Sequence, residues 1–271
     1  MVVRRQAALE RLMARLTVAV PERWALKGGL ALDTRLGDHA RASMDMDIDH
    51  AQGDVAARED LVRATQLNLG DYFGFAVVGA REVQDEGLRL ATRYSVVSSV
   101  GGPHFETVQV DVTVTPPEVW EVERAQRPGL LAPLGFAPVE VFLTPLDRQV
   151  AEKLHAYTRT YGGGRRSTRV KDLVDLTLIR LFERVQADRL RDAIDRTFAS
   201  RATHTIPQYV PTPPDDWGPA YREEATRVGI TPDLPDAQRF VATWLDPVLQ
   251  GTAHGEWDPD QGIWTSKPSL P

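Results

Sequence analysis

The chain has 271 residues, of which 42% are hydrophobic and 26% charged, a composition typical of a globular protein with a sizeable core. Its net charge of −6 excludes a surface coated in positive potential, although a local basic patch remains compatible with it. The absence of cysteine excludes disulfides, cysteine–zinc sites and thiol nucleophiles, and it fits a cytoplasmic protein. No apolar run approaches the roughly 18 residues that span a bilayer, so no membrane association is predicted.

The first half of the chain is predicted to alternate helices and strands. Apolar residues at helical spacing predict a helix over 4–19, and shorter helices are expected over 30–36 and 55–69. Alternating or continuous apolar runs predict strands over 23–27, 43–49, 72–83, 88–99, 105–114 and 138–143. The pattern therefore indicates an α/β domain over residues 1–143.

The second half is predicted to be helical. Thr144 and Pro145 make an N-cap followed by proline in the first helical position, which marks the boundary. Helical patterns follow over 145–161, 169–185, 187–199, 219–227 and 236–249. The segment 204–235 is rich in proline and is expected to be largely irregular, so residues 144–271 are predicted to form a helical C-terminal domain.

Three aspartates alternate with apolar residues in "SMDMDID", residues 43–49. Side chains of a strand alternate between its faces, so Asp45, Asp47 and Asp49 are expected to point one way while the apolar residues face the core. A divalent cation between carboxylates relieves their repulsion, and hard oxygen ligands favour Mg²⁺ or Mn²⁺. Asp49 is interpreted as an exposed residue at the strand end rather than a third ligand. The third carboxylate is predicted to be Asp111, which stands alone among apolar residues in "TVQVDVTV" and is costly to bury without a partner.

Two glycines precede this acidic strand in "ALKGGLALDTRLGDHARASMDMDID", residues 25–49. Lys27, Gly28 and Gly29 follow a predicted strand and open a helix, an arrangement in which backbone N–H groups can approach a phosphate. Glycine pairs at such turns are common, but the combination with an Asp-x-Asp strand and a third strand aspartate is specific for nucleotide chemistry.

These residues resemble the nucleotidyltransferases of the DNA polymerase β superfamily, and more narrowly the AbiEii/AbiGii family of type IV toxins that includes the MenT toxins. The segments "EKLHA" (152–156), "RVKDLVDL" (169–176) and "FVATWLDPVL" (240–249) resemble later parts of the same family. The resemblance implies an α+β fold, with a mixed-sheet nucleotidyltransferase lobe, a helical C-terminal domain and an active site between them.

The resemblance also implies an activity. It implies Mg²⁺-dependent transfer of a nucleotide from an NTP, with release of pyrophosphate, onto an RNA such as the 3′ end of tRNA, which blocks translation. A cognate antitoxin is implied as well, although such antitoxins need not form a stable complex with the toxin.

Site residues are carried over by position. Asp45 and Asp47 would bind metal, Gly28 and Gly29 the triphosphate, and Lys153 the phosphates. Asp172 would be the catalytic acidic residue of the last motif, with Asp175 as the alternative. Ser43 would contact phosphate or be a point of regulation.

Two further sets of site residues are predicted from the residue pattern itself rather than from the resemblance. Asp111 is predicted to complete the metal site and to help deprotonate the acceptor hydroxyl. A basic run after a glycine hinge, comprising Arg165, Arg166, Arg169 and Lys171, is predicted to meet triphosphate or RNA backbone. His155, two residues after Lys153, is interpreted as a packing histidine.

Two alternatives stay open on the sequence. A nucleotidyltransferase of the same fold can modify a small molecule such as an antibiotic, and the acidic net charge mildly favours that substrate over RNA. A non-catalytic nucleotide-binding module is also possible on the fold, but the intact set of Asp45, Asp47 and Asp111 disfavours it.

Overall fold

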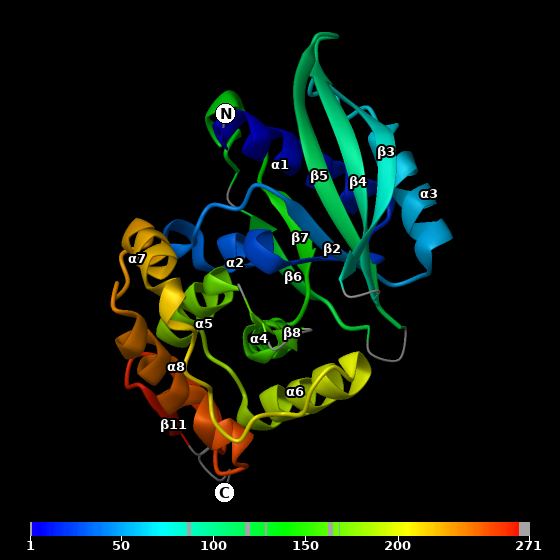
Figure 1. Cartoon of the computed structure of the whole chain (residues 1–271). Coiled ribbons are helices and arrows are strands. Elements are labelled where there is room, and N and C mark those ends of the chain that lie inside the picture. Colours follow the sequence, from blue (N-terminus) through cyan, green and yellow to red (C-terminus); the bar gives the residue numbers. More distant parts are fainter. Residues whose placement is uncertain are drawn as a thin grey trace, which may run out of the picture. The chain divides into compact units, whose positions relative to one another are not determined.

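The computed structural model describes residues 2–85, 88–116, 120–127, 129–161, 165–167 and 169–265, and it divides into two compact units (Figure 1). The first unit comprises Met1–Asp38 and Ala42–Pro145, and the second comprises His39–Arg41 and Leu146–Pro271. Among the helices within these ranges, none combines the length and the hydropathy needed to cross a membrane.

The first unit is built on a seven-stranded mixed sheet with the strand order β3-β4-β5-β2-β1-β7-β6. β2 pairs with β5 and β1 with β7 in parallel, whereas the other neighbours are antiparallel. The strands are β1 (Trp24–Lys27), β2 (Met46–His50), β3 (Phe73–Asp85), β4 (Leu88–Val100), β5 (His104–Val114), β6 (Glu123–Arg127) and β7 (Val139–Leu143).

Helices α1 (Val2–Ala19) and α3 (Asp54–Thr65) pack against each other and against the sheet. The predicted apolar stripe of α1 forms the core with strand residues, and Leu9, Leu12 and Leu16 are buried. α2 (Gly28–Leu36) follows β1 and contacts β1, β2 and β6. The short 3-10 turn η3 (Ala132–Leu134) lies in this unit, and η1 (Gly37–His39) ends on His39, the first residue of the segment assigned to the second unit.

A buried ion pair network ties α1 to the start of β3. Arg15 forms two hydrogen bonds with Asp71, at 2.6 and 2.8 Å, and Arg11 donates to the same carboxylate at 2.6 Å. Burial alone would raise the pKa of Asp71, but these hydrogen bonds outweigh it and lower the pKa to about 2. The network therefore needs both charges, because removing either side would leave an uncompensated buried ion.

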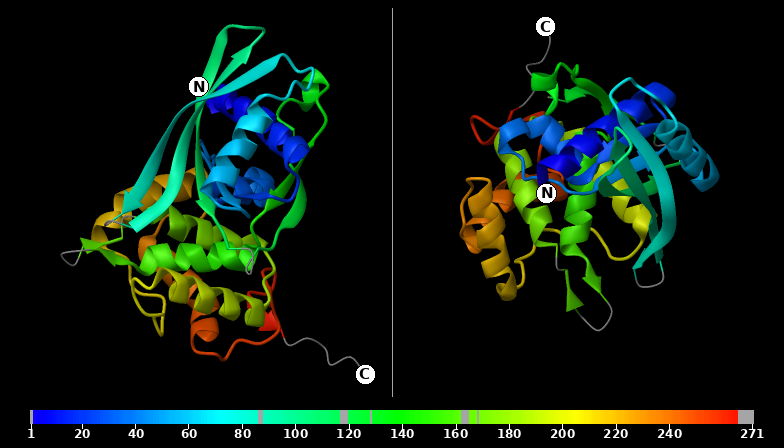
Figure 2. Two further views of the ribbon diagram at one scale, coloured as in Figure 1. Left: turned by 90° about the vertical axis from the view of Figure 1, so that its right-hand side faces the viewer. Right: turned by 90° about the horizontal axis from the view of Figure 1, so that it is seen from above.

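Strands β3, β4 and β5 form a long ribbon within this unit, drawn in cyan and green in Figures 1 and 2. One of its faces is apolar: Val96, Val108 and Val110 are buried against the helices. Since cross-strand partners share a face, the opposite face carries Ser95 and Gln109, which are both half-buried.

The second unit is mostly helical, with α4 to α8 packed around a core that includes Leu154, Leu173 and Trp244. Its segment His39–Arg41 is held by stacking of His39 on Phe182, with ring centroids 4.2 Å apart. The elements are α4 (Leu146–Thr158), β8 (Thr160–Tyr161), β9 (Arg165–Arg166), α5 (Val170–Phe182), α6 (Ala187–Arg201), η5 (Asp215–Trp217), α7 (Gly218–Arg227), α8 (Leu234–Leu249), β10 (Glu256–Asp258) and β11 (Ile263–Thr265).

The predicted helices and strands are confirmed as elements, with several differences in their bounds and additions. The helix predicted over 55–69 ends at Thr65, and the one predicted over 145–161 ends at Thr158 and is followed by the unpredicted strand pair β8 and β9. β2 begins at Met46, so Asp45 precedes the strand rather than lying in it. β6 was not predicted, because the edge sequence "ERAQR" has no apolar alternation to signal a strand. The same holds for the small hairpin of β10 and β11 near the C-terminus. The predicted glycine hinge at 162–164 lies outside the described residues.

Candidate active site

Gly28 lies at the turn between β1 and α2 with a φ of +62°, a conformation that favours glycine. A Cβ atom built at this position would lie 2.5 Å from Asp47 Oδ2, so any side chain would displace that carboxylate. Lys27 at the N-cap makes no side-chain cap hydrogen bond, which leaves the first-turn N–H groups of α2 without that cap. The turn therefore places a helix N-terminus beside an aspartate.

Two of the predicted carboxylates face each other across neighbouring strands. Asp47 of β2 pairs in register with Asp111 of β5, and partners in register point to the same face of a sheet. Lys27 and Arg93 occupy the same row on the outer sides of this pair. A row with two central carboxylates and flanking cations therefore crosses four strands on one face.

Arg93 holds Asp111 in a two-pronged ion pair, with N–O distances of 2.6 and 2.5 Å. Its hydrogen bond with Asp111 raises the pKa of Arg93 above its ordinary value, and the charges of Asp45 and Asp47 add to the effect. All three carboxylates thus act on one guanidinium, and Arg93 neutralises part of the repulsion that the acidic row creates.

Asp45 and Ser43 lie in the irregular segment that leads into β2. Asp45 is exposed, whereas Ser43 is buried and donates a hydrogen bond from its hydroxyl to the Asp45 carbonyl oxygen at 3.3 Å. The position of Ser43 indicates that it shapes the turn before the acidic strand.

The interpretation of Asp49 as an exposed residue at the strand end is wrong. Asp49 is completely buried, with Lys27 Nζ 2.9 Å from its Oδ1 and the hydroxyl of Thr144 donating to its Oδ2 at 3.1 Å. Lys27 also donates to the Thr113 hydroxyl at 2.9 Å. The strand is covered at this end, so Asp49 is a structural partner of Lys27, and the lysine predicted to bind nucleotide reaches inward in this structure.

The donor set suits a divalent ion, because carboxylate oxygens are the ligands that Mg²⁺ and Mn²⁺ prefer and Asp47 faces Asp111 directly. Within the described ranges, however, no three carboxylate or imidazole side chains are grouped closely enough to hold a metal together. Arg93 in addition binds both oxygens of Asp111. The chemistry of the residues fits a metal, and the third ligand is engaged by an arginine.

The second unit contains a separate charged cluster around Lys153 of α4. Its ammonium group lies 2.5 Å from Asp175 and 3.2 Å from Asp172, both of α5. Burial alone would lower the pKa of Lys153, but the two carboxylates hold it above its ordinary value. Lys153 is therefore charged and internally paired.

The two candidate aspartates of this cluster have different surroundings. Asp175 is completely buried and also accepts two hydrogen bonds from Arg41, at 2.8 and 2.9 Å, so its pKa stays below its ordinary value despite burial. Neither of these two bonds from Arg41 goes to Asp172, and the Oδ2 atom of Asp172 lacks a hydrogen-bond partner. Both oxygens of Asp175 are therefore held by protein cations, whereas Asp172 has one buried oxygen without a hydrogen-bond partner.

The remaining predicted residues of the second unit have other surroundings. Lys171 is 59% exposed on α5, with Nζ 3.6 Å from Glu224. Arg169 is exposed at the N-cap of α5, and Arg165 and Arg166 form β9, paired with β8. His155 is buried against Phe198 and donates to or accepts from Thr203 at 2.9 Å, as expected of a packing residue.

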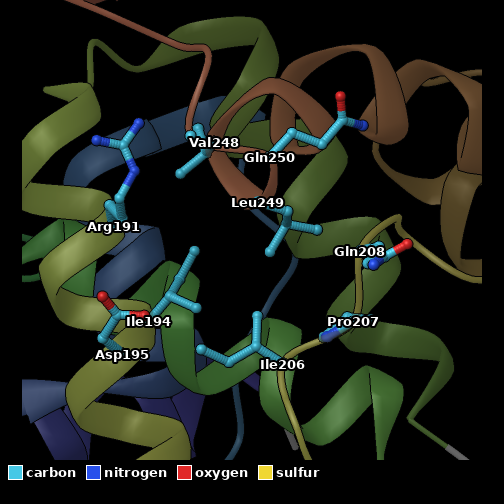
Figure 3. A pocket seen from close by; sticks show the side chains of 10 residues that line it. Arg191, Ile194, Asp195, Ile206, Pro207, Gln208, Val248, Leu249 and Gln250 are labelled. Carbon is cyan, nitrogen blue, oxygen red and sulfur yellow. The ribbon is translucent and has the colours of Figure 1, made fainter.

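The second unit also has a cavity of about 370 Å³, bordered by α6, the segment 206–208 and the end of α8 (Figure 3). Its lining is mixed, with Ile194, Ile206, Val248 and Leu249 beside the polar Arg191, Asp195, Gln208 and Gln250. None of the predicted site residues lines it, so the cavity is separate from both the acidic row and the Lys153 cluster.

The fold and the first unit's acidic row together define a class of protein. A glycine turn opens a helix beside a strand aspartate, and a second aspartate lies on the adjacent parallel strand, as the resemblance to nucleotidyltransferases implies. Residues 11–243 match the family model described as "Nucleotidyl transferase AbiEii toxin, Type IV TA system". The chain belongs to this AbiEii family, and it is a nucleotidyltransferase of the toxin type.

A solved structure agrees with this assignment of the fold. The chain is similar to MenT4, a nucleotidyltransferase toxin from Mycobacterium tuberculosis, with a TM-score of 0.54, 17% identity and 92% of each chain covered. An antigenic nucleotidyltransferase-like protein from Paracoccidioides brasiliensis is more distant, with a TM-score of 0.37, 18% identity and coverage of 72% of this chain and 88% of the other. No curated protein sequence matches the chain.

Membership of the family has consequences for ligands. A nucleotidyltransferase takes its nucleotide from an NTP and works with a divalent metal ion, and a type IV system pairs the toxin with an antitoxin. Carboxylates such as those of Asp47 and Asp111 are the type of oxygen donor that a divalent ion prefers.

Proposed function

We propose that the protein transfers a nucleotide from an NTP to an RNA acceptor, the 3′ end of tRNA, and thereby blocks translation. The observation that carries this proposal is the in-register pair of Asp47 and Asp111 beside the Gly28 turn. In the proposed reaction the acceptor hydroxyl oxygen bonds to the α-phosphorus, the bond from that phosphorus to the bridging oxygen breaks, and pyrophosphate leaves.

Each residue of the first unit has a proposed part in this reaction. Asp45, Asp47 and Asp111 would hold Mg²⁺, which when bound supplies charge neutralisation for the phosphates and the attacking oxygen. Gly28 and Gly29 let backbone N–H groups of α2 approach the triphosphate. Asp111 accepts the proton of the attacking hydroxyl once its oxygens are released from Arg93.

In the second unit, Lys153 is proposed to contact the phosphates and Asp172 to be the catalytic acidic residue. The unpaired Oδ2 atom of Asp172 favours it over Asp175 as the acidic residue that takes part in the reaction. Arg165, Arg166 and Arg169 remain the predicted RNA contacts of this unit, and Lys171 a predicted phosphate contact.

The proposal is tested by incubating the purified chain with Mg²⁺, each labelled NTP and total tRNA. We expect label on tRNA with at least one NTP, and none with Asp45→Ala. Label on a small-molecule acceptor but never on RNA would establish the antibiotic-type alternative, and no transfer to any acceptor would contradict the activity itself.

The toxin role has its own test in cells. Induced expression is expected to arrest growth, and co-expression of a neighbouring antitoxin or the Asp45→Ala substitution is expected to restore it. Unimpaired growth with abundant soluble protein would contradict the toxin role while leaving the enzymatic activity open to the assay above.

A further inference from the structure

The acidic row continues into a flat polar face of the ribbon formed by β3, β4 and β5. Arg81 pairs in register with Arg93, and Arg93 with Asp111, so the row of the active site reaches the edge strand β3. Three more rows follow along the same face toward the turn between β4 and β5. They are Gly79–Ser95–Gln109, Ala76–Val97–Thr107 and Gly74–Ser99–His104.

The side chains of these rows are small, mostly polar and partly open to solvent. Ser95, Val97, Ser99, Thr107 and Gln109 are all half-buried, and the Ser95 hydroxyl donates to Gln109 Oε1 at 3.1 Å. At Gly74 a Cβ atom would lie 2.8 Å from the Ser99 hydroxyl oxygen, so this position has no room for a larger residue. The strands thus present a shallow surface with hydroxyl and amide groups.

The charged side chains of this face gather at its active-site end. Within β3, β4 and β5 the four rows contain Arg81, Arg93 and His104, and their one carboxylate is Asp111, which Arg93 pairs and which Asp47 of β2 faces across the same row. The acidic residues of these strands at Glu82 and Glu106 pair with Thr92 and Ser98, in register positions that alternate to the opposite face. The carboxylates of this face are therefore confined to its active-site end, and the other three rows carry no carboxylate that would repel phosphates.

An exposed aromatic residue stands at the far end of the rows. Tyr72 immediately precedes β3, is 82% exposed, and has a φ of +61° that is unusual for a residue with a side chain. Its carbonyl oxygen accepts a hydrogen bond from Gly101 N at 3.0 Å, which fixes it to the turn that carries His104. An exposed aromatic ring held in a strained backbone conformation is suited to stacking on a base.

We propose that this ribbon face binds the single-stranded 3′ end of the RNA acceptor, with phosphates along the polar rows and a base stacked on Tyr72. The inference rests on the proposed function, because it names where the acceptor of that reaction lies. From Asp111 to His104 the strand covers roughly 23 Å, a length that spans several nucleotides of a single strand. Small side chains allow close approach of the backbone, and hydroxyl and amide groups can bond to phosphate and 2′-hydroxyl oxygens.

The test is a fluorescence anisotropy titration of the full chain with a labelled single-stranded RNA of about 12 nucleotides at low salt, without NTP. The double substitution Ser95→Glu with Gln109→Glu adds two carboxylates to the face, and it is expected to weaken RNA binding by at least about tenfold. The matched control, Ser200→Glu with Thr226→Glu, adds the same charge at exposed helix positions of the second unit and is expected to change binding less than about twofold.

A second pair of variants separates stacking from charge. Tyr72→Ala is expected to weaken RNA binding by at least about fivefold, while Tyr209→Ala, which removes a tyrosine that is 60% exposed in the second unit, is expected to leave it unchanged. Binding of a fluorescent NTP analogue with Mn²⁺ is expected to be unaltered in all four variants, which also shows that they fold.

The outcomes distinguish this inference from the proposed function. If labelled nucleotide reaches tRNA but the ribbon variants bind RNA like their controls, the face is not the acceptor site and the activity stands. If the wild-type chain binds duplex RNA or no RNA at all, the inference is overturned. If the single strand binds at this face but no label is ever transferred, the proposed function fails and the binding surface remains.

Discussion

Two clusters of acidic and basic side chains in this protein have similar composition and opposite surroundings. In the first unit, Asp47 and Asp111 lie on a half-buried sheet face, and Gly28 packs so closely on Asp47 that any side chain there would displace the carboxylate. In the second unit, Asp175 is sealed against Lys153 and Arg41. The two clusters therefore differ in burial: Asp175 is closed off by two cations, whereas Asp47 and Asp111 stay half-buried on the sheet face, with Arg93 on Asp111.

The largest effect of a substitution in either cluster is expected at Asp47. Asp47→Asn removes a proposed metal ligand, so we expect nucleotide transfer to fall by at least about a thousandfold while the thermal midpoint changes little. Transfer assays and thermal unfolding measure the two quantities. Retention of activity would contradict both the assignment of Asp47 to the metal site and the contrast between the clusters.

The opposite result is expected in the second unit. Asp175→Asn leaves the ammonium of Lys153 and the guanidinium of Arg41 buried without their shared carboxylate, which costs about 3–5 kcal/mol of unfolding free energy. Denaturant unfolding measures the loss, and Asp172→Asn serves as the control with a smaller effect. Equal losses for the two variants would mean that Asp175 has no special structural role.

Gly28 offers a finer contrast, because a matched glycine exists at the other end of the same helix. Gly28→Ala places a methyl group 2.5 Å from Asp47 Oδ2, and we expect transfer to fall about a hundredfold from the displaced carboxylate. Gly37→Ala meets a similar positive φ but has nothing within 4 Å of the new Cβ, so it should strain the backbone without affecting transfer. Equal loss in both variants would indicate backbone strain rather than the Asp47 contact.

Arg93 allows the availability of a carboxylate to be changed directly. Arg93→Leu releases both oxygens of Asp111, and we expect Mn²⁺ to bind about tenfold more tightly in calorimetric titration, since charge-assisted hydrogen bonds of this kind contribute about 1.5–3 kcal/mol. Arg81→Leu, one strand further out, is the control with unchanged affinity. Weaker Mn²⁺ binding in Arg93→Leu would show that Arg93 orders the site instead of competing for it.

A smaller effect is expected on the pH dependence of the unfolding free energy, through His155 of the second unit. Burial, with Arg201, His204 and Arg159 adding to it, lowers the pKa of His155 to about 3 from an ordinary value of 6.5. The unfolded chain therefore takes up this proton below about pH 6.5 while the folded chain does not, so unfolding free energy falls as pH drops from 6.5 toward 3.

Replacing this histidine should remove that dependence. His155→Phe keeps an aromatic ring against Phe198 and is expected to give a shallower loss of stability over this pH range in urea unfolding. An unchanged slope would assign the acid sensitivity to other groups. Above pH 6.5 the histidine makes no contribution to the pH dependence.

Much of the fold followed from local pattern, and the failures share a physical reason. The helix over α1 and the strands β3, β4 and β5 were predictable from apolar periodicity, since each buries one face. Strand β6 was missed because its edge position leaves charged residues on both faces. Asp49 was misplaced because its burial depends on Lys27 and Thr144, which approach from other elements.

The sequence alone determines the motif spacing, the types of element and the likeness to the AbiEii family. It also determines the alternation that sets aspartates on one face of a strand. Contacts between distant segments were needed to establish that Asp111 stands opposite Asp47, that Arg93 binds it, and that Asp175 is closed off. Alternation is a local property of backbone geometry, whereas strand register and burial arise only when segments far apart in the chain pack together.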